Sequence, residues 1–297
     1  MTAAVPEPRP LSRQVPAEGI RLRGVFHTYG RGTPHEVTAL RGVDLDIAPG
    51  QFVAVVGHNG SGKSTVAKHL NVLLQPTEGD VWVDGLNTRD PAARMAIRRR
   101  VGMVFQNPDN QIVGITVEHD VAFGLENLGL PVEVIEQRID EALRLLGIEH
   151  LRHEPPHRLS AGQKQRLAIA GVVAMRPRYM VLDEATALLD PAGRAEVLDC
   201  IVRLNREEGL GVVWITHFME EAVHADQVVV MEGGQVVMAG TPRQVFQQAE
   251  EIRRLRLDVP LVTRIAAGLR ERGLPVPADA VFLEEVVQSV CRSASGD

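Results

Sequence analysis

The range Leu159–Asp190 constrains the fold more than any other part of this 297-residue chain. It opens with Leu-Ser-Ala-Gly-Gln, in which Ser160 is a good helix N-cap, so a helix with free backbone N–H groups is predicted to begin near Gly162. An apolar strand follows and ends in Asp183 and Glu184. A helix start that can bind an anion, before a buried strand that ends in two acids, predicts an α/β domain with a ligand site at a sheet edge.

A second phosphate-binding motif lies upstream and fits the pattern GxxxxGK[ST]. It follows the apolar strand Phe52–Val56 and precedes a helical pattern, which argues against an ordinary glycine-rich turn. Glycines let backbone N–H groups converge on phosphate oxygens, Lys63 supplies a cation for the β- and γ-phosphates, and the Ser64 hydroxyl can bind Mg²⁺. The predicted contacts to a bound nucleotide are Gly57, His58, Asn59, Gly60, Ser61, Gly62, Lys63, Ser64 and Thr65.

Composition narrows the class of protein. The hydrophobic content of 44% and the charged content of 24% are ordinary for a globular chain, and no apolar run approaches the roughly 20 residues of a membrane span. The net charge of −6 and the lack of a basic tail argue against nucleic acid as the main partner. Cys200 and Cys291 lack metal-site spacing, and Cys200 is expected to be a buried apolar residue in a reduced, cytoplasmic chain.

Strand and helix patterns alternate along most of the chain and predict three parts. Residues 1–19 contain four prolines and no apolar core, so a disordered leader is expected rather than a signal peptide. Residues 20–241 are predicted to form the α/β domain, with a helical subdomain at about residues 107–175. Residues 242–297 are expected to add two short helices, too small for an independent core. The expected strands are 20–28, 43–47, 52–56, 81–83, 101–105, 179–182, 212–215, 228–231 and 235–238.

The two acids at the end of the strand 179–182 carry the predicted chemistry. Asp183 can hold Mg²⁺, directly or through water, and Glu184 is placed to orient or deprotonate an attacking water. The alternative is a pair of capping or surface acids, which the upstream phosphate motif disfavours. The sequence therefore predicts hydrolysis of a nucleoside triphosphate.

Five motifs in this order give the chain a family resemblance: GHNGSGKS, FQNPDNQ, LSAGQKQR, VLDEATALLD and WITHFMEEA. Over about residues 20–241 the chain resembles the nucleotide-binding subunit of an ATP-binding-cassette (ABC) transporter. The resemblance implies a P-loop NTPase fold of the ABC ATPase type, with a RecA-like core, an antiparallel β subdomain, a helical subdomain and a small C-terminal helical extension. It also implies ATP and Mg²⁺ as cofactors.

Three finer features resemble the ATPase (A-component) of energy-coupling factor (ECF) transporters, which import vitamins and transition-metal ions. They are the segment FQNPDNQIVGITVEHDVAFGLEN, the form DEATALLD, and the tail LRLDVPLVTRIAAGLRERG. The resemblance assigns Tyr29 to stacking on adenine, Gln106 to Mg²⁺ and to sensing the transmembrane partner, and His217 to the γ-phosphate. Taken alone, Tyr29 could be a core residue and His217 a strand-end histidine.

The same resemblance implies a head-to-tail dimer in which Ser160, Ala161, Gly162 and Gln163 of one ATPase close over the phosphate loop of another, with Asp190 at the seam. Ala161 stands where the common pattern has glycine, and its methyl group limits positive φ. If Ala161 weakens ATP binding, the effect is therefore expected at the ATP site of the partner subunit.

The expected partners follow from this family. They are a second ATPase (a related but different chain, although a homodimer is possible), a transmembrane T-component and a substrate-binding membrane S-component. Asp109 and Asn110 are expected to touch the T-component, and the tail to help hold the two ATPases together. The chain is expected to be peripheral on the cytoplasmic face of the cell membrane.

Other functions stay open. An ATPase of a conventional ABC importer is the main alternative. A soluble ABC ATPase that remodels nucleic acid or ribosomes would be expected to show tandem cassettes, coiled coils or basic surfaces, which this chain lacks. A non-catalytic nucleotide sensor is disfavoured because Lys63, Asp183, Glu184 and His217 are all present. The sequence does not name the transported substrate.

Overall fold

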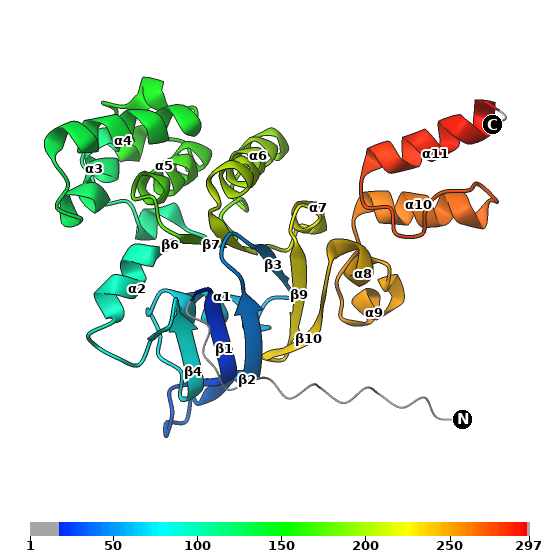
Figure 1. The fold of residues 1–297 in the computed structure, drawn as a ribbon, viewed down its shortest axis with the longest axis horizontal. Helices are drawn as coiled ribbons and strands as arrows, with labels where there is room; N and C mark the ends of the chain where they lie inside the picture. The colour runs from blue at the N-terminus through cyan, green and yellow to red at the C-terminus, as the bar shows by residue number, and fades with distance from the viewer. Residues whose placement is uncertain (1–17, 296–297) are drawn as a thin grey trace.

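Two β-sheets organise the part of the chain that the computed structural model describes, residues 18–295. Most of the predicted leader, residues 1–17, lies outside the described residues. Figure 1 shows the sheets at the centre, a helical lobe beside α5 and α6, and a C-terminal extension on the opposite side. Among the described residues, no helix has the length and apolar character that a bilayer span requires.

The larger sheet has the strand order β10-β9-β3-β8-β7-β6. The pairs β9–β3, β3–β8, β8–β7 and β7–β6 are parallel, and β10 is antiparallel to β9. Every residue of β3, β7 and β8 is buried, as expected for parallel strands that are covered on both faces. The strands are β3 (Phe52–Val56), β6 (Val101–Val104), β7 (Tyr179–Asp183), β8 (Gly211–Ile215), β9 (Gln227–Glu232) and β10 (Gln235–Gly240).

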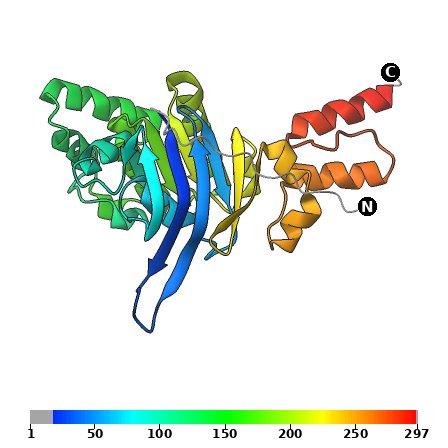
Figure 2. The same cartoon turned by 60° about the horizontal axis from the view of Figure 1, so that its bottom comes forward.

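The smaller sheet is antiparallel and has the order β2-β1-β4-β5. Its strands are β1 (Ile20–Tyr29), β2 (Val37–Ile47), β4 (Glu78–Val83) and β5 (Leu86–Asn87). Figure 2 shows the β1–β2 hairpin extending beyond the rest of the molecule. One apolar cluster joins residues of both sheets to the buried face of α1 (Lys63–Leu70), so α1 is held between them. The helix that begins at the phosphate motif is thereby fixed in a core.

Helices cover the other face of the larger sheet. They include α3 (Val117–Asn127), α4 (Val132–Leu145), α5 (Ala161–Ala174) and α6 (Pro191–Glu208), which share one large apolar cluster with the sheet. The sequence prediction of two helices at 117–128 and 132–146 is confirmed to within one residue at each end. Shorter helices are α2 (Arg94–Arg100), α7 (Met219–Ala222), and the 3₁₀ turns η1 (Pro108–Asn110), η2 (Glu149–Leu151) and η3 (Pro156–Arg158).

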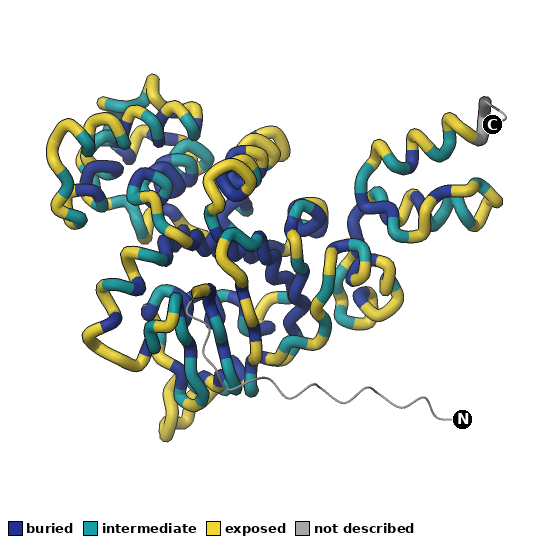
Figure 3. Tube along the Cα trace, viewed as in Figure 1, coloured by how far each residue is buried: buried dark blue, intermediate teal, exposed yellow. Residues whose placement is uncertain are grey.

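The C-terminal part contains four helices, two more than expected: α8 (Pro242–Phe246), α9 (Ala249–Arg254), α10 (Leu261–Glu271) and α11 (Leu283–Ser295). The first two were missed because they are only five and six residues long, too short to show a helical period. The last two were expected to be too small for an independent core and to pack on the main domain or on another chain, and Val281, just before α11, is part of the main apolar cluster. Ala266, Val276, Ala280 and Val286 form a separate buried cluster, because the connecting loop folds back between α10 and α11. Figure 3 shows many exposed residues along both helices.

Candidate functional site

The phosphate motif forms the turn between β3 and α1, and its conformation requires glycine. Gly60 and Gly62 have φ values of 82° and 105°, in the left-handed region that side chains disfavour. A Cβ atom on Gly62 would lie 2.8 Å from the Ala39 carbonyl oxygen and 2.9 Å from the Leu40 side chain. The loop can therefore approach a phosphate closely while its far side packs against β2.

Lys63 is the first residue of α1 and is only 4% exposed. Its ammonium donates hydrogen bonds to the carbonyl oxygens of Gly57, at 2.8 Å, and His58, at 3.0 Å. Burial lowers the pKa of Lys63, and the nearby carboxylates of Glu184 and Asp183 oppose that shift. The cation is thus held inside the loop, where an anionic ligand would compensate its desolvation.

Asp183 ends β7 directly beside this helix start. The Ser64 hydroxyl donates a hydrogen bond of 2.9 Å to the Asp183 carboxylate. Burial raises the pKa of Asp183, and the Ser64 hydrogen bond partly offsets the effect. Among the described residues, no group of three or more His, Cys, Asp or Glu could hold a metal ion. A hydroxyl and one carboxylate fit Mg²⁺, which takes its remaining ligands from phosphates and water.

Glu184 brings together three other predicted residues. Its carboxylate accepts a hydrogen bond of 2.8 Å from the Gln106 amide and lies 4.0 Å from the Lys63 ammonium and 3.9 Å from His217 Nδ1. Its φ of 51° is left-handed, which is unusual for a residue with a side chain. The Glu184 backbone N–H donates to the Ile215 carbonyl oxygen at 3.0 Å, which holds the residue against β8.

Lys63, Ser64, Gln106 and Glu184 line a cavity of about 440 Å³, whereas Asp183 and His217 are not part of the lining described for it. Tyr29, at the end of β1, is 39% exposed, and its hydroxyl lies 3.2 Å from the Thr65 hydroxyl. An exposed ring at the mouth of the cavity can stack on a base. The lining residues are Tyr29, Val37, Thr38, Ala39, Asn59, Gly60, Gly62, Lys63, Ser64, Thr65, Gln106 and Glu184.

The segment 159–163 lies elsewhere, and none of its residues is part of the lining described for that cavity. Ser160 caps α5: its hydroxyl accepts from the Gln163 backbone N–H, and the Gln163 side chain accepts from the Ser160 N–H. Asp190 caps α6 in a similar way, by accepting from the Gly193 N–H at 3.0 Å. A Cβ on Gly162 would lie 3.2 Å from the Leu189 side chain, so the two helix starts are neighbours. The predicted residues therefore form two separate groups within one chain.

Comparison with known proteins decides the family. Residues 40–187 match the ABC transporter family. The chain is 58% identical, over 92% of its length and 96% of the relative, to the energy-coupling factor transporter ATP-binding protein EcfA1 of Symbiobacterium thermophilum. It is 51% identical to EcfA1 of Caldanaerobacter subterraneus, over 92% of this chain and 99% of the relative. The chain belongs to the ATP-binding proteins of energy-coupling factor transporters.

Solved structures agree with this membership. The structure of cbiO1 from Clostridium perfringens, described as part of the ABC transporter complex cbiONQ, is 38% identical with a TM-score of 0.71 and covers 85% of this chain and 98% of its own. A dimeric ATP-binding cassette bound to ADP and Pi is 32% identical with a TM-score of 0.70, over 75% and 98% of the two chains. The predicted ABC ATPase fold is confirmed. As an ECF ATPase, the chain binds ATP and couples its hydrolysis to transport.

Sequence reasoning missed three residues of the 440 Å³ cavity in this ECF ATPase. Val37, Thr38 and Ala39 line it from β2, whose register with β1 places Val37 opposite Tyr29 and Thr38 opposite Thr28. No motif marks these positions. The strand was expected to begin only at residue 43, because the polar positions before it interrupt the apolar pattern.

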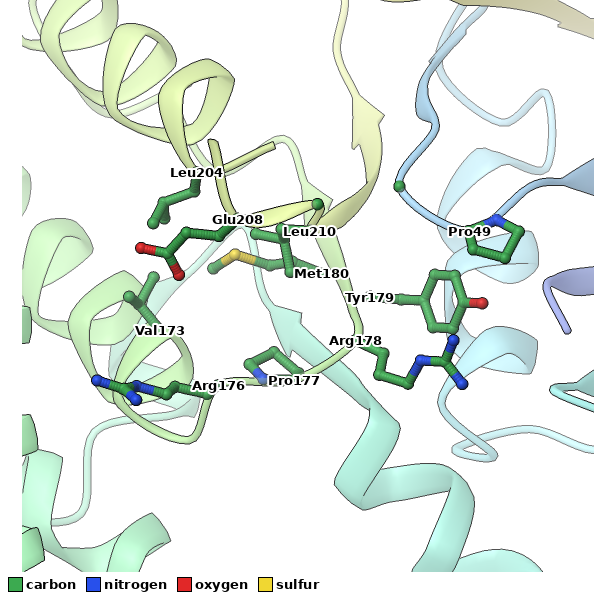
Figure 4. A pocket seen from close by; sticks show the side chains of 12 residues that line it. Pro49, Val173, Arg176, Pro177, Arg178, Tyr179, Met180, Leu204, Glu208 and Leu210 are labelled. Atoms are coloured by element: carbon green, nitrogen blue, oxygen red, sulfur yellow. The ribbon is translucent and has the colours of Figure 1, made fainter. Parts of the chain in front are cut away.

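Another cavity, of about 290 Å³, lies at the N-terminal ends of β7 and β8, the edge of the sheet opposite to Asp183. Figure 4 shows the side chains that line it. Two arginines line it, and both already have acidic partners: Arg176 contacts Glu141 at 2.6 Å, and Arg178 contacts Asp84 at 3.0 Å. No predicted site residue of the ECF ATPase lines this cavity. Both arginines of this cavity are therefore already paired with acids of the same chain.

Proposed function

We propose that this chain powers an ECF-type importer of vitamins or transition-metal ions, as one half of a head-to-tail ATPase dimer on the cytoplasmic face of the membrane. The observation that carries the proposal is the separation of the two phosphate-binding elements. Lys63 and Glu184 line the ATP cavity, whereas Ser160 and Gly162 do not. A second anion site without a ligand in its own chain is explained most simply by the ATP of another subunit.

The first group of residues supports in-chain catalysis. We assign the phosphate contacts to residues 57–65, with Lys63 neutralising the β- and γ-phosphates, and the adenine contact to Tyr29. Ser64, Asp183 and Gln106 are the proposed ligands of Mg²⁺, which would supply charge neutralisation at the phosphate oxygens. Glu184 lies within 4.0 Å of Lys63 and is held by Gln106, which places a carboxylate near the expected position of the attacking water.

His217 and Glu184 lie on loops that follow neighbouring parallel strands, β8 and β7. With His217 Nδ1 3.9 Å from the Glu184 carboxylate, the imidazole can contact a γ-phosphate while the carboxylate orients water on it. This arrangement supports the proposed role of His217 as the γ-phosphate contact. Hydrolysis would remove that contact and so loosen the closed dimer.

The second group supports closure across two chains. Ser160 and Ala161 are exposed at the start of α5, and Asp190 is exposed at the start of α6. Since these helix starts are neighbours, they present one surface with free N–H groups. We assign Ser160, Ala161, Gly162 and Gln163 to the partner's ATP, and Asp190 to the seam beside them.

We propose that the T-component binds in a groove between α2, α3 and α5. Its volume is about 320 Å³, and Met95, Val113 and Phe123 are large apolar residues exposed along it. The adjacent turn η1 is tied to α5 by an ion pair of 2.7 Å between Asp109 and Lys164. Lys164 lies four residues after Ser160, so a force on η1 would reach the helix start that faces the partner's ATP.

The division of the chain fits this assembly. We propose residues 20–241 as the ATPase domain, about residues 107–175 as its helical subdomain, and residues 242–297 as an extension that contacts the second ATPase. Leu261 and Ile265 on α10, with Leu283 and Val287 on α11, are exposed large apolar side chains. Burying them against another chain would favour association.

The proposal is tested by purifying the chain from detergent-solubilised membranes and identifying the proteins that accompany it. An ECF assembly predicts a second ATPase, a T-component and at least one small S-component, which selects the substrate. A pair of large permease subunits with a separate binding protein would indicate a conventional ABC importer. Ribosomes or nucleic acid without membrane proteins would contradict a transport function.

A further inference from the structure

Glu221 is a buried carboxylate that none of the roles above uses. It lies in α7, four residues after His217, and is 5% exposed. Three side chains donate hydrogen bonds to it: Thr186 to Oε1 at 2.7 Å, Trp214 to Oε2 at 2.9 Å, and Thr216 to Oε2. A buried carboxylate is costly unless hydrogen bonds satisfy it, so this site is built around an acceptor.

Two of the three donors belong to the loops that carry the hydrolysis site. Thr186 lies two residues after Glu184, on the loop that leaves β7. Thr216 lies one residue before His217, on the loop that leaves β8, and its hydroxyl also accepts from the Phe218 N–H at 2.9 Å. The Glu221 carboxylate therefore binds both loops: Oε1 accepts from Thr186 on one loop, and Oε2 accepts from Thr216 on the other.

We propose that Glu221 is a positioning residue that sets the separation of Glu184 and His217, and thereby the geometry of the attacking water and the γ-phosphate. The inference rests on the roles proposed above for these two residues. Rates of reactions between held groups fall steeply when the groups are displaced by about 1 Å. The Glu184 N–H already holds the start of one loop against the end of β8, and the Glu221 carboxylate adds a side-chain link between the two loops beyond the strand ends, which limits such displacement further.

A substitution at Trp214 can distinguish a positioning role of Glu221 from a role in stabilising the fold. Trp214 donates to the same carboxylate, but it lies within β8 and packs in the main apolar cluster, so it belongs to neither loop. Removing its N–H leaves the links of Glu221 to Thr186 and Thr216 intact. Trp214→Phe is therefore a matched control, because it perturbs the same buried acid without releasing either loop.

The experiment compares Glu221→Gln, Thr186→Val and Trp214→Phe in the complete complex as it co-purifies from membranes. Glutamine has one acceptor oxygen and one donor nitrogen, so the nitrogen would face at least one of the three donors and that hydrogen bond would be lost. We expect Glu221→Gln and Thr186→Val to lower kcat by about 10- to 100-fold. Because neither residue lines the ATP cavity, KM and ATP affinity should stay within about threefold of the original values. Trp214→Phe should lower the melting temperature and leave kcat per bound ATP unchanged.

The inference would be overturned if Glu221→Gln and Thr186→Val kept the kcat per bound ATP of the original protein. It would also be overturned if Trp214→Phe lowered kcat as much as these two variants do. If Glu221→Gln does not fold, Thr186→Val still tests the link, since it retains the carboxylate. Glu184→Gln distinguishes the two levels of the argument: if it keeps its turnover, the proposed catalytic role itself fails, whereas if it is inactive and Thr186→Val is not, only the positioning role fails.

Discussion

Gln106 and Glu184 are joined by a hydrogen bond of 2.8 Å, although they lie 78 positions apart. Gln106 stands between β6 and the turn η1, at the entrance to the helical lobe, and Glu184 stands at the end of β7. The amide therefore connects the surface proposed for the T-component to the carboxylate proposed to activate water. A shift of η1 during transport would reach Glu184 without passing through the phosphate loop.

Replacement of Glu184 by Gln should separate binding from hydrolysis. Glutamine keeps an acceptor for Gln106 but cannot deprotonate water, so turnover should fall by about 10²–10⁴-fold. ATP binding should persist, because Lys63 and the phosphate loop are unchanged. Phosphate release and retention of labelled ATP measure the two effects. Lys63→Ala is the control and should lose binding; undiminished turnover in Glu184→Gln would favour a nucleotide sensor.

The phosphate loop and the two acids were predictable from sequence because each lies within a short contiguous motif that a strand and a helix frame. Contacts between distant segments were not. The cavity wall formed by Thr38 depends on the register between β1 and β2, and the buried role of Glu221 depends on which loops surround α7. Local patterns also miss short elements such as α9, whose six residues are stabilised mainly by tertiary packing.

The alanine at position 161 should not impair function. Ala161 is the first residue of α5 and is not among the described residues with positive φ, so the expected restriction does not arise. Ala161→Gly should therefore leave the ATPase rate of the assembled complex similar or raise it, since at the first helical position glycine loses less than the about 1 kcal/mol that it costs in a helix interior. Ser160→Ala, which removes the cap, should lower the rate. A large loss in Ala161→Gly would contradict the placement of this segment.

Acidification should destabilise the protein through His69, which is fully buried in α1. Burial lowers the pKa of His69 from 6.5 to about 4, and it also lowers the pKa of the neighbouring His27. Below pH 6.5 His69 becomes protonated in the unfolded chain but stays neutral in the folded protein. The free energy of unfolding therefore decreases as the pH falls from 6.5 to about 4. At about 1.4 kcal/mol per pKa unit, the full loss is about 3 kcal/mol.

His69→Phe tests this assignment, because the ring contact with His27 can persist while the titrating group is removed. The free energy of unfolding is measured from pH 7 to pH 4.5, and the variant should show a shallower decline than the original protein. His35→Phe replaces an exposed histidine and should leave the decline unchanged. Parallel curves for the original protein and His69→Phe would show that another group is responsible.

Ile265 should contribute to the contact between the two ATPases. Ile265 and Leu261 lie one turn apart on α10 and are exposed, so a charge at this position would remain solvated in the isolated chain but would be buried in the pair. Ile265→Asp should weaken association, measured by sedimentation of the purified ATPases, and should leave ATP binding by the single chain intact. Glu271→Lys, at the exposed end of the same helix, is the control. Undiminished association would exclude this surface from the interface.

Disulfide cross-linking should capture the head-to-tail contact. Cysteines at positions 59 and 160 replace exposed residues of the phosphate loop and of the start of α5, and a disulfide requires Cα atoms within about 7 Å. The exposed Cys291 must first become serine. Cys200 can remain, because burial raises its pKa to about 11 and keeps its thiol protonated.

The cross-link should form in the Glu184→Gln background with ATP, because trapped nucleotide holds the dimer closed, and it should be lost without nucleotide. A product between two copies of this chain would show a homodimer. If the proposed partner is a different ATPase, the cysteine at position 160 should instead join an engineered cysteine in that chain's phosphate loop. The cross-linked product should still hold two ATP molecules. A disulfide that forms only within one chain would mean that Ser160 serves its own ATP, and the proposed division of the two phosphate-binding elements between subunits would be wrong.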